Sequence, residues 1–226
     1  MIKFDNVSKH YPDSSVALED VSFSVEPEEF VSVVGHSGAG KTTLLKMLLA
    51  EEKPSKGKVF VSDTDVHSLR PDDMNTMRRN IGVVFQDFRL LPHKNIYENI
   101  AFAMEAAGRP DEDIDADVPY SLELVGLERK MWSFPHELSG GEKQRAAIAR
   151  AIVNQPDIVI ADEPTGNLDP ENTYEIVQIL KKINELGTLV FLTTHNTGVI
   201  DALGNRVITM KGGRVVKDDR EGKYDV

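Results

Sequence analysis

Short apolar runs, rich in β-branched residues, recur along the chain and are separated by longer segments of mixed character. Three of them, at residues 81–85, 158–161 and 189–193, are typical of parallel strands that are buried on both faces. Helical patterns precede the last two runs, so the core is predicted to be a parallel α/β sheet. A partly exposed antiparallel sheet is predicted from the patterns at residues 2–7, 21–25 and 58–61.

Residues 88–138 differ in character from the rest of the chain. Apolar segments at 96–107 and 120–127 flank a polar stretch. That stretch is crowded with Asp111, Glu112, Asp113, Asp115 and Asp117. We interpret the region as a mostly helical insertion with an acidic, solvated connector.

The clearest chemical signal directly follows the β-type run at residues 30–34. Its pattern, G-x-x-x-x-G-K-[ST], is that of a loop whose backbone N–H groups cradle phosphate oxygens. Lys41 is expected to reach the β- and γ-phosphates, and Thr42 to offer its hydroxyl to Mg²⁺. The alternative is a glycine-rich turn with an exposed lysine. The residues expected to contact the nucleotide are Gly35, His36, Ser37, Gly38, Ala39, Gly40, Lys41, Thr42 and Thr43.

Two carboxylates, Asp162 and Glu163, end the apolar run at 158–161. The carboxyl end of a buried strand is where open α/β sheets bind ligands. Asp162 is expected to hold Mg²⁺, directly or through water, and Glu163 to take a proton from an attacking water. An acid pair at a helix N-terminus is the alternative.

A second glycine-rich segment, Leu138-Ser139-Gly140-Gly141-Glu142, opens an alanine-rich helical pattern. Ser139 and Glu142 have the spacing of a capping box, which stabilises a helix start whatever the function. The paired glycines expose backbone N–H groups, and Lys143 and Arg145 add positive charge where helix stability alone favours acids. The segment is therefore a candidate for a second phosphate site.

Composition narrows the possible partners. The 226 residues carry a formal net charge of −11, which argues against nucleic acid and against direct binding to an anionic membrane surface. The chain has no cysteine, so disulfides and cysteine nucleophiles are excluded. No apolar run is long enough to span a bilayer and no signal peptide is visible, so a soluble, cytoplasmic protein is expected.

These motifs resemble those of the ATP-binding cassette (ABC) ATPases. Together with Gln86, Asn167-Leu168-Asp169 and His195, they occur in that family's order and spacing over essentially the whole chain. The resemblance implies a single domain over residues 1–226. It implies a P-loop (RecA-like) α/β core with an antiparallel β subdomain and a helical subdomain near 88–138. It also implies Mg²⁺-dependent hydrolysis of ATP.

The family's roles carry over to the matching positions of this chain. Tyr11 would stack on adenine, Gln86 would contact Mg²⁺ and the attacking water, and His195 would touch the γ-phosphate. Asp169 would lie at the seam of a homodimer that binds two ATP molecules between its subunits. Each P-loop would face the other subunit's signature segment, Ser139, Gly140, Gly141 and Glu142. An ordinary half-buried tyrosine, a solvated loop glutamine and a strand-end histidine are the structural alternatives.

Within the family, several segments resemble members that act in bacterial cell division. They are residues 85–92, 97–99, 194–196 and 206–208, the run Gly213-Arg214-Val215-Val216, and Gly222-Lys223-Tyr224. Departures are Lys143, where the broader family usually has glutamine, and Gly204-Asn205 in a region that is often basic.

This resemblance implies an integral membrane partner that holds this chain at the cytoplasmic face of the cell membrane, at the division site. Through this partner, ATP-driven closure of the chain would regulate peptidoglycan hydrolases. Division-ring proteins are further candidate partners. The groove of this chain that binds the partner is expected beside Gln86. Its candidate residues are the exposed apolar side chains of Phe88, Leu90, Leu91 and Tyr97.

Two other functions remain open. One is the ATPase subunit of a transporter for lipoprotein release or macrolide export. The other is a nucleotide-dependent division scaffold with incidental hydrolysis, against which Glu163 and His195 both argue. DNA-repair ATPases that share the signature are disfavoured, because no long heptad segment separates the motifs.

Overall fold

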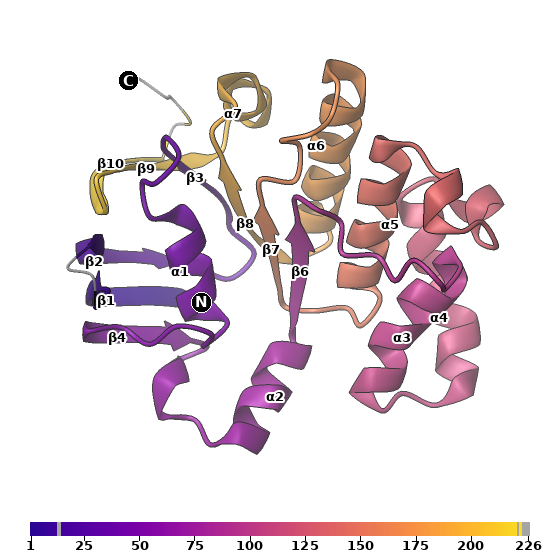
Figure 1. Cartoon of the computed structure of the whole chain (residues 1–226), viewed down its shortest axis with the longest axis horizontal. Coiled ribbons are helices and arrows are strands. Elements are labelled where there is room, and N and C mark those ends of the chain that lie inside the picture. Colours follow the sequence, from indigo (N-terminus) through magenta and orange to yellow (C-terminus); the bar gives the residue numbers. More distant parts are fainter. Residues whose placement is uncertain (13–14, 221, 223–226) are drawn as a thin grey trace.

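The computed structural model describes residues 1–12, 15–220 and 222, and their strands form a six-stranded and a four-stranded sheet (Figure 1). The larger sheet has the order β10-β9-β3-β8-β7-β6. Its neighbouring strands run parallel except β10, which is antiparallel to β9. Its strands are β3 (Phe30–Val34), β6 (Ile81–Phe85), β7 (Ile158–Asp162), β8 (Leu189–Thr194), β9 (Arg206–Lys211) and β10 (Arg214–Asp219).

The smaller sheet is antiparallel, as its partly exposed pattern predicts. Its order is β2-β1-β4-β5. Its strands are β1 (Ile2–His10), β2 (Val16–Val25), β4 (Lys56–Val61) and β5 (Thr64–Asp65).

Helices cover the outer face of the larger sheet. Figure 1 shows α6 and α5 beside this sheet, with α3 and α4 beyond α5, while the smaller sheet and α1 lie on the other side. The helices are α1 (Lys41–Leu48), α2 (Pro71–Arg79), α3 (Ile96–Ala107), α4 (Asp111–Leu124), α5 (Gly140–Ile152), α6 (Pro170–Glu185) and α7 (Thr197–Leu203). Short 3₁₀ helices are η1 (Val66–Ser68), η2 (Glu128–Lys130) and η3 (Pro135–Glu137).

The central strands are apolar at successive positions because they are covered on both faces. In β7, Ile158 and Ile160 belong to the core shared with α1 and the smaller sheet, whereas Val159 and Ala161 belong to the core shared with α5 and α6. Side chains of a strand alternate between its faces, so this arrangement needs apolar residues at every position. The predicted α/β fold class is confirmed.

The acidic stretch at 111–117 is not a connector, and that interpretation was wrong. It forms the first half of α4, with Asp111 and Glu112 in the first turn. Acids at a helix N-terminus are stabilised by the helix dipole. Arg109 adds ion pairs to Asp113 at 2.8 Å and to Asp117 at 3.3 Å. The charge density therefore favours a helix here.

No helix in the described part of the chain is long and apolar enough to cross a bilayer. Lys223 and Tyr224, which contribute to the C-terminal resemblance, lie outside the described residues. The parallel strands β3, β6, β7 and β8 direct their carboxyl ends to one edge of the sheet. This edge is the expected position of a ligand site.

Candidate active site

A cavity of about 550 Å³ lies at the carboxyl edge of the larger sheet. It brings together the P-loop, the residue after β6, the acid after β7 and the histidine after β8, as the sequence predicts. Its lining residues are Ala17, His36, Ser37, Gly38, Ala39, Gly40, Lys41, Thr42, Thr43, Gln86, Glu163 and His195.

The P-loop joins β3 to α1, and its glycines permit the tight turn. Gly40 has a φ of 103°, a conformation that L side chains rarely adopt. A Cβ atom there would lie 2.7 Å from the carbonyl oxygen of Ala17. Lys41 begins α1 and is only 7% exposed. Its ammonium donates to the backbone oxygens of Gly35 at 2.6 Å and His36 at 3.3 Å, so its charge is fixed inside the loop.

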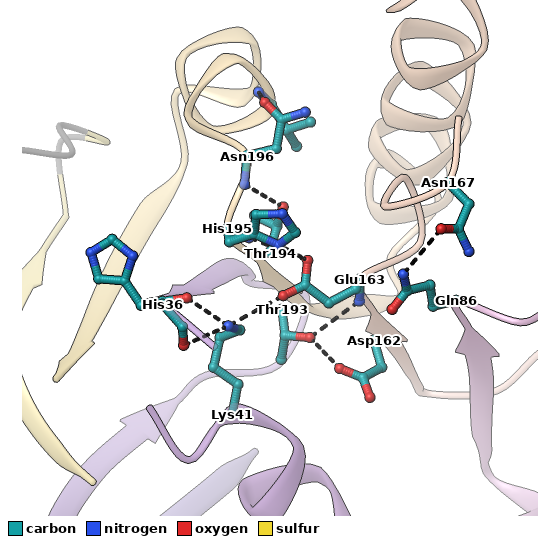
Figure 2. A network of polar contacts seen from close by, with 12 residues as sticks. His36, Lys41, Gln86, Asp162, Glu163, Asn167, Thr193, Thr194, His195 and Asn196 are labelled. Carbon is teal, nitrogen blue, oxygen red and sulfur yellow. Dashed lines mark hydrogen bonds and ion pairs between the residues drawn. The ribbon is translucent and has the colours of Figure 1, made fainter. Parts of the chain in front are cut away.

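Glu163 lies at the centre of the polar network in Figure 2. Its Oε1 is 3.2 Å from Lys41 Nζ, and its Oε2 is 2.7 Å from His195 Nδ1. The backbone N–H of His195 also points at Oε2, at 3.3 Å. Glu163 has a φ of 48°, an uncommon conformation for a residue with a side chain and one that recurs at functional sites. The carboxylate thus lies where the P-loop lysine and the strand-end histidine meet.

Asp162 is the last residue of β7 and contacts β8. Its Oδ1 accepts a hydrogen bond of 2.6 Å from the hydroxyl of Thr193. Sequence reasoning did not single out Thr193. The signal that could have found it is a hydroxyl residue near the end of an otherwise apolar run.

Gln86 follows β6 and is exposed. Its Nε2 donates to Asn167 Oδ1 at 3.4 Å, which joins the loop after β6 to the loop after β7. Gly166 lies so close that a Cβ atom there would be 2.8 Å from Nε2. The amide is therefore held in place at the edge of the cavity.

The signature residues are not among those that line this cavity. Ser139 caps α5 by accepting from the backbone N–H of Glu142 at 3.2 Å, and Glu142 Oε2 accepts from the backbone N–H of Ser139 at 2.8 Å. That second bond lowers the pKa of Glu142. Arg145 forms an ion pair with Glu175 of α6, so its charge is directed at the neighbouring helix.

Asp169 and Tyr11 also lie outside the cavity lining. Asp169 caps α6 by accepting from the backbone N–H of Asn172 at 2.9 Å, and this bond lowers its pKa. Tyr11 has Lys9 Nζ 5.1 Å from its ring centroid. An adenine contact for Tyr11 and a dimer-seam role for Asp169 stay predictions.

The expected partner surface is only partly as predicted. Leu90 and Tyr97 pack against the core beneath the helices, so they are not free apolar residues. The hydroxyl of Tyr97 donates to Asp115 at 2.7 Å, which raises the pKa of Tyr97 to about 12. Leu91 lines a separate groove between the sheet and α3. Phe88 is half-buried, and Arg150 holds its backbone oxygen at 2.8 Å.

Comparisons with known proteins agree with this arrangement. The ABC transporter family model matches residues 18–166. The cell division ATP-binding protein FtsE of Streptococcus pneumoniae is 49% identical over 224 residues, 99% of this chain and 97% of that protein. FtsE of Bacillus subtilis is 47% identical over 99% of this chain and 98% of that protein, and FtsE of Escherichia coli K12 is 41% identical over 95% and 97%.

Solved structures agree as well. A dimer of the ATP-binding cassette MJ0796, bound to ADP and Pi in a post-hydrolysis state, has a TM-score of 0.89 at 36% identity, covering 99% of this chain and all of that one. CbiO1 of Clostridium perfringens, part of the transporter complex cbiONQ, has a TM-score of 0.90 at 29% identity, covering 97% and 88%. The chain belongs to the ABC transporter family, as an ATP-binding and ATP-hydrolysing cassette with FtsE proteins among its relatives.

Proposed function

We propose that this chain is the ATPase subunit of a bacterial cell-division complex, with an FtsX-like integral membrane protein as its partner. The observation that carries the proposal is the 41% to 49% identity, over nearly the full length of the chain, to FtsE proteins of three bacteria. In this proposal the chain works at the cytoplasmic face of the membrane, at the division site. ATP-driven changes are passed through the partner to peptidoglycan hydrolases.

Glu163 is the proposed general base for the attacking water. A base must lie within hydrogen-bond reach of its proton, and Glu163 is the carboxylate that lines the cavity beside Lys41. His195 holds Oε2 of this carboxylate and is exposed toward the cavity, which suits contact with the γ-phosphate. Lys41 provides the positive charge for the β- and γ-phosphates.

Thr42, Gln86 and Asp162 are the proposed residues for Mg²⁺. Their donors are a hydroxyl, an amide oxygen and a carboxylate, and this all-oxygen set suits a hard cation that keeps several waters and phosphate ligands. When bound, Mg²⁺ would neutralise charge on the transferred phosphoryl group. Thr42 lies in the first turn of α1, Gln86 directly follows β6 and Asp162 ends β7, so three segments contribute to one edge of the sheet.

A second copy of the chain is the proposed source of the remaining phosphate contacts. Ser139 and Gly140 are exposed at the start of α5 and do not line their own subunit's cavity. Backbone N–H groups at a helix start suit a phosphate. The dimeric MJ0796 structures, which cover this whole fold, support such a pairing.

A groove of about 450 Å³ beside Gln86 is the proposed docking site for the membrane partner. Its apolar lining includes Phe85, Leu91 and Phe102. Its described lining residues contain Arg78, Arg79, Arg89 and Arg150 but no acid, and Arg89 pairs with Asp87 outside this lining at 3.2 Å. In a chain of net charge −11, such a basic groove suits a cytoplasmic segment of the partner that carries apolar and acidic side chains.

Arg150 joins this groove to the helix that begins at the signature segment. It extends from α5 and donates to the backbone oxygens of Arg89 at 2.6 Å and Phe88 at 2.8 Å. Burial, followed by the neighbouring charge of Arg89, lowers the pKa of Arg150, as expected for a cation that has no carboxylate partner among the described residues. The loop after Gln86 is thereby tied to the helix that begins at the signature.

Leu91→Asp is expected to abolish membrane recruitment and any stimulation of ATPase activity by the partner. The substitution removes apolar contact area from the groove and repels an acidic segment. Nucleotide binding by the isolated protein should not change, because Leu91 does not line the nucleotide cavity. Membrane fractionation, followed by co-purification of the integral partner, measures the effect.

Leu186→Asp is the matched control, because Leu186 is 63% exposed and lies outside the groove. It should leave recruitment unchanged. Undiminished recruitment of Leu91→Asp would place the docking surface elsewhere. Recovery of a transport permease in place of a division protein would contradict the proposed role.

A further inference from the structure

Thr193 connects both active-site carboxylate residues from the neighbouring strand. It lies in β8 directly opposite Asp162 of β7 and is 0% exposed. Figure 2 shows its hydroxyl between the two residues. The hydroxyl donates to Asp162 Oδ1 at 2.6 Å and accepts from the backbone N–H of Glu163 at 3.3 Å.

The donated bond fixes one oxygen of Asp162. A hydroxyl has a single hydrogen to donate, and here the carboxylate receives it. Bonds to an ionised group are stronger than neutral ones, so this bond restricts rotation of the Asp162 carboxylate. Among the described residues, Oδ2 of Asp162 accepts no hydrogen bond, so the second oxygen stays free for another ligand.

The accepted bond supports Glu163 at a strained position. The backbone N–H of Glu163 donates to two oxygens of Thr193, the side-chain hydroxyl and the backbone carbonyl oxygen, the second at 3.0 Å. The chain turns sharply at Glu163, whose φ is 48°. Uncommon backbone conformations persist only where the surroundings enforce them.

We propose that Thr193 is a positioning residue that orients Asp162 for the metal and Glu163 for the attacking water. The inference rests on the proposed magnesium role of Asp162. Residues that hydrogen-bond to a metal ligand and fix its orientation typically contribute about 10–100-fold to metal affinity or activity. One buried hydroxyl would then set the geometry of both acids.

The test compares Thr193→Val, which keeps the shape but removes the hydroxyl, with Thr193→Ser, which keeps the hydroxyl. The full chain is titrated with a non-hydrolysable ATP analogue in the presence of Mn²⁺ and again in EDTA. The ratio of the two dissociation constants measures the contribution of the metal. Thr193→Val should lower this contribution about 10-fold, leave binding in EDTA unchanged, and lose ATPase activity to a similar degree. Thr193→Ser should restore both.

Thr209→Val is the matched control. The Thr209 hydroxyl is buried in β9 and has no hydrogen-bond partner in the described part of the chain, so its loss should alter neither constant. A purely structural role for Thr193 would weaken binding in Mn²⁺ and in EDTA alike, and that outcome would overturn the inference. The same holds if Thr193→Ser behaves like Thr193→Val.

Asp162→Asn distinguishes a failure of this inference from a failure of the proposed magnesium role of Asp162. If Asp162→Asn lowers the metal contribution and Thr193→Val does not, Asp162 is the ligand and Thr193 does not position it. If neither variant lowers it, the magnesium role of Asp162 fails together with the inference.

Discussion

Glu163→Gln is expected to lower ATP turnover by about 10²–10⁴-fold, the usual contribution of a general base. The amide keeps the size of the side chain but cannot accept a proton from water. ATP should still bind, because Lys41 keeps its contacts to the P-loop oxygens of Gly35 and His36. The variant should therefore hold two subunits together around ATP. Steady-state ATPase assays and sedimentation with and without ATP measure both effects.

Glu185→Gln is the control for this prediction, because Glu185 is an exposed residue at the end of α6. The same change there should leave turnover near the parent rate. Parent-rate hydrolysis by Glu163→Gln would show that another group accepts the proton. If instead Glu163→Gln lost turnover but still supported normal cell division, the protein would act as a nucleotide-dependent scaffold.

Sequence alone predicts the parts of this site that are contiguous in the chain. The P-loop glycines and Lys41 lie within eight residues of one another, and Asp162 and Glu163 follow a recognisable buried strand. Parallel strands place their carboxyl ends at one edge, so convergence of Lys41 and Glu163 could be expected. Their ion pair of 3.2 Å agrees with that reasoning.

Thr193 was missed because its role depends on strand register. The register places it opposite Asp162, and a shift of one residue would turn its side chain to the other face. Hydrophobic periodicity shows that β8 is buried but not which residue of β7 each position meets. Arg150 was missed for a different reason: its contacts with Phe88 and Arg89 depend on how α5 packs against a loop about 60 residues away in the chain.

The acidic stretch shows how composition can mislead. A run of like charges suggests a solvated connector, yet the first turns of a helix favour acids. Arg109, which precedes the run, pairs with Asp113 and Asp117 along one face of α4. The helical spacing of these acids from Arg109 indicated a helix, whereas the density of negative charge did not.

Gly140→Asp is expected to abolish ATP-dependent dimerisation and hydrolysis while leaving ATP binding at the P-loop intact. The structure favours Gly140 over Gly141 for this test. A Cβ atom on Gly140 would meet only Leu168, at 3.4 Å, whereas one on Gly141 would overlap Asn172 Oδ1 and disrupt packing between α5 and α6. The variant at Gly140 should therefore fold normally.

The size of the effect follows from like-charge repulsion between the new carboxylate and the other subunit's γ-phosphate. Two unit charges about 4 Å apart at an effective dielectric constant of about 20 repel by about 4 kcal/mol, or about 10³-fold in a binding constant. Gly140→Ala adds a side chain without charge, so it should retain much more of the dimerisation. Equilibrium binding of a fluorescent ATP analogue, together with sedimentation in the Glu163→Gln background, separates nucleotide affinity from assembly. Loss of ATP affinity in a folded Gly140→Asp monomer would place the signature in its own subunit's site and contradict the shared-site arrangement.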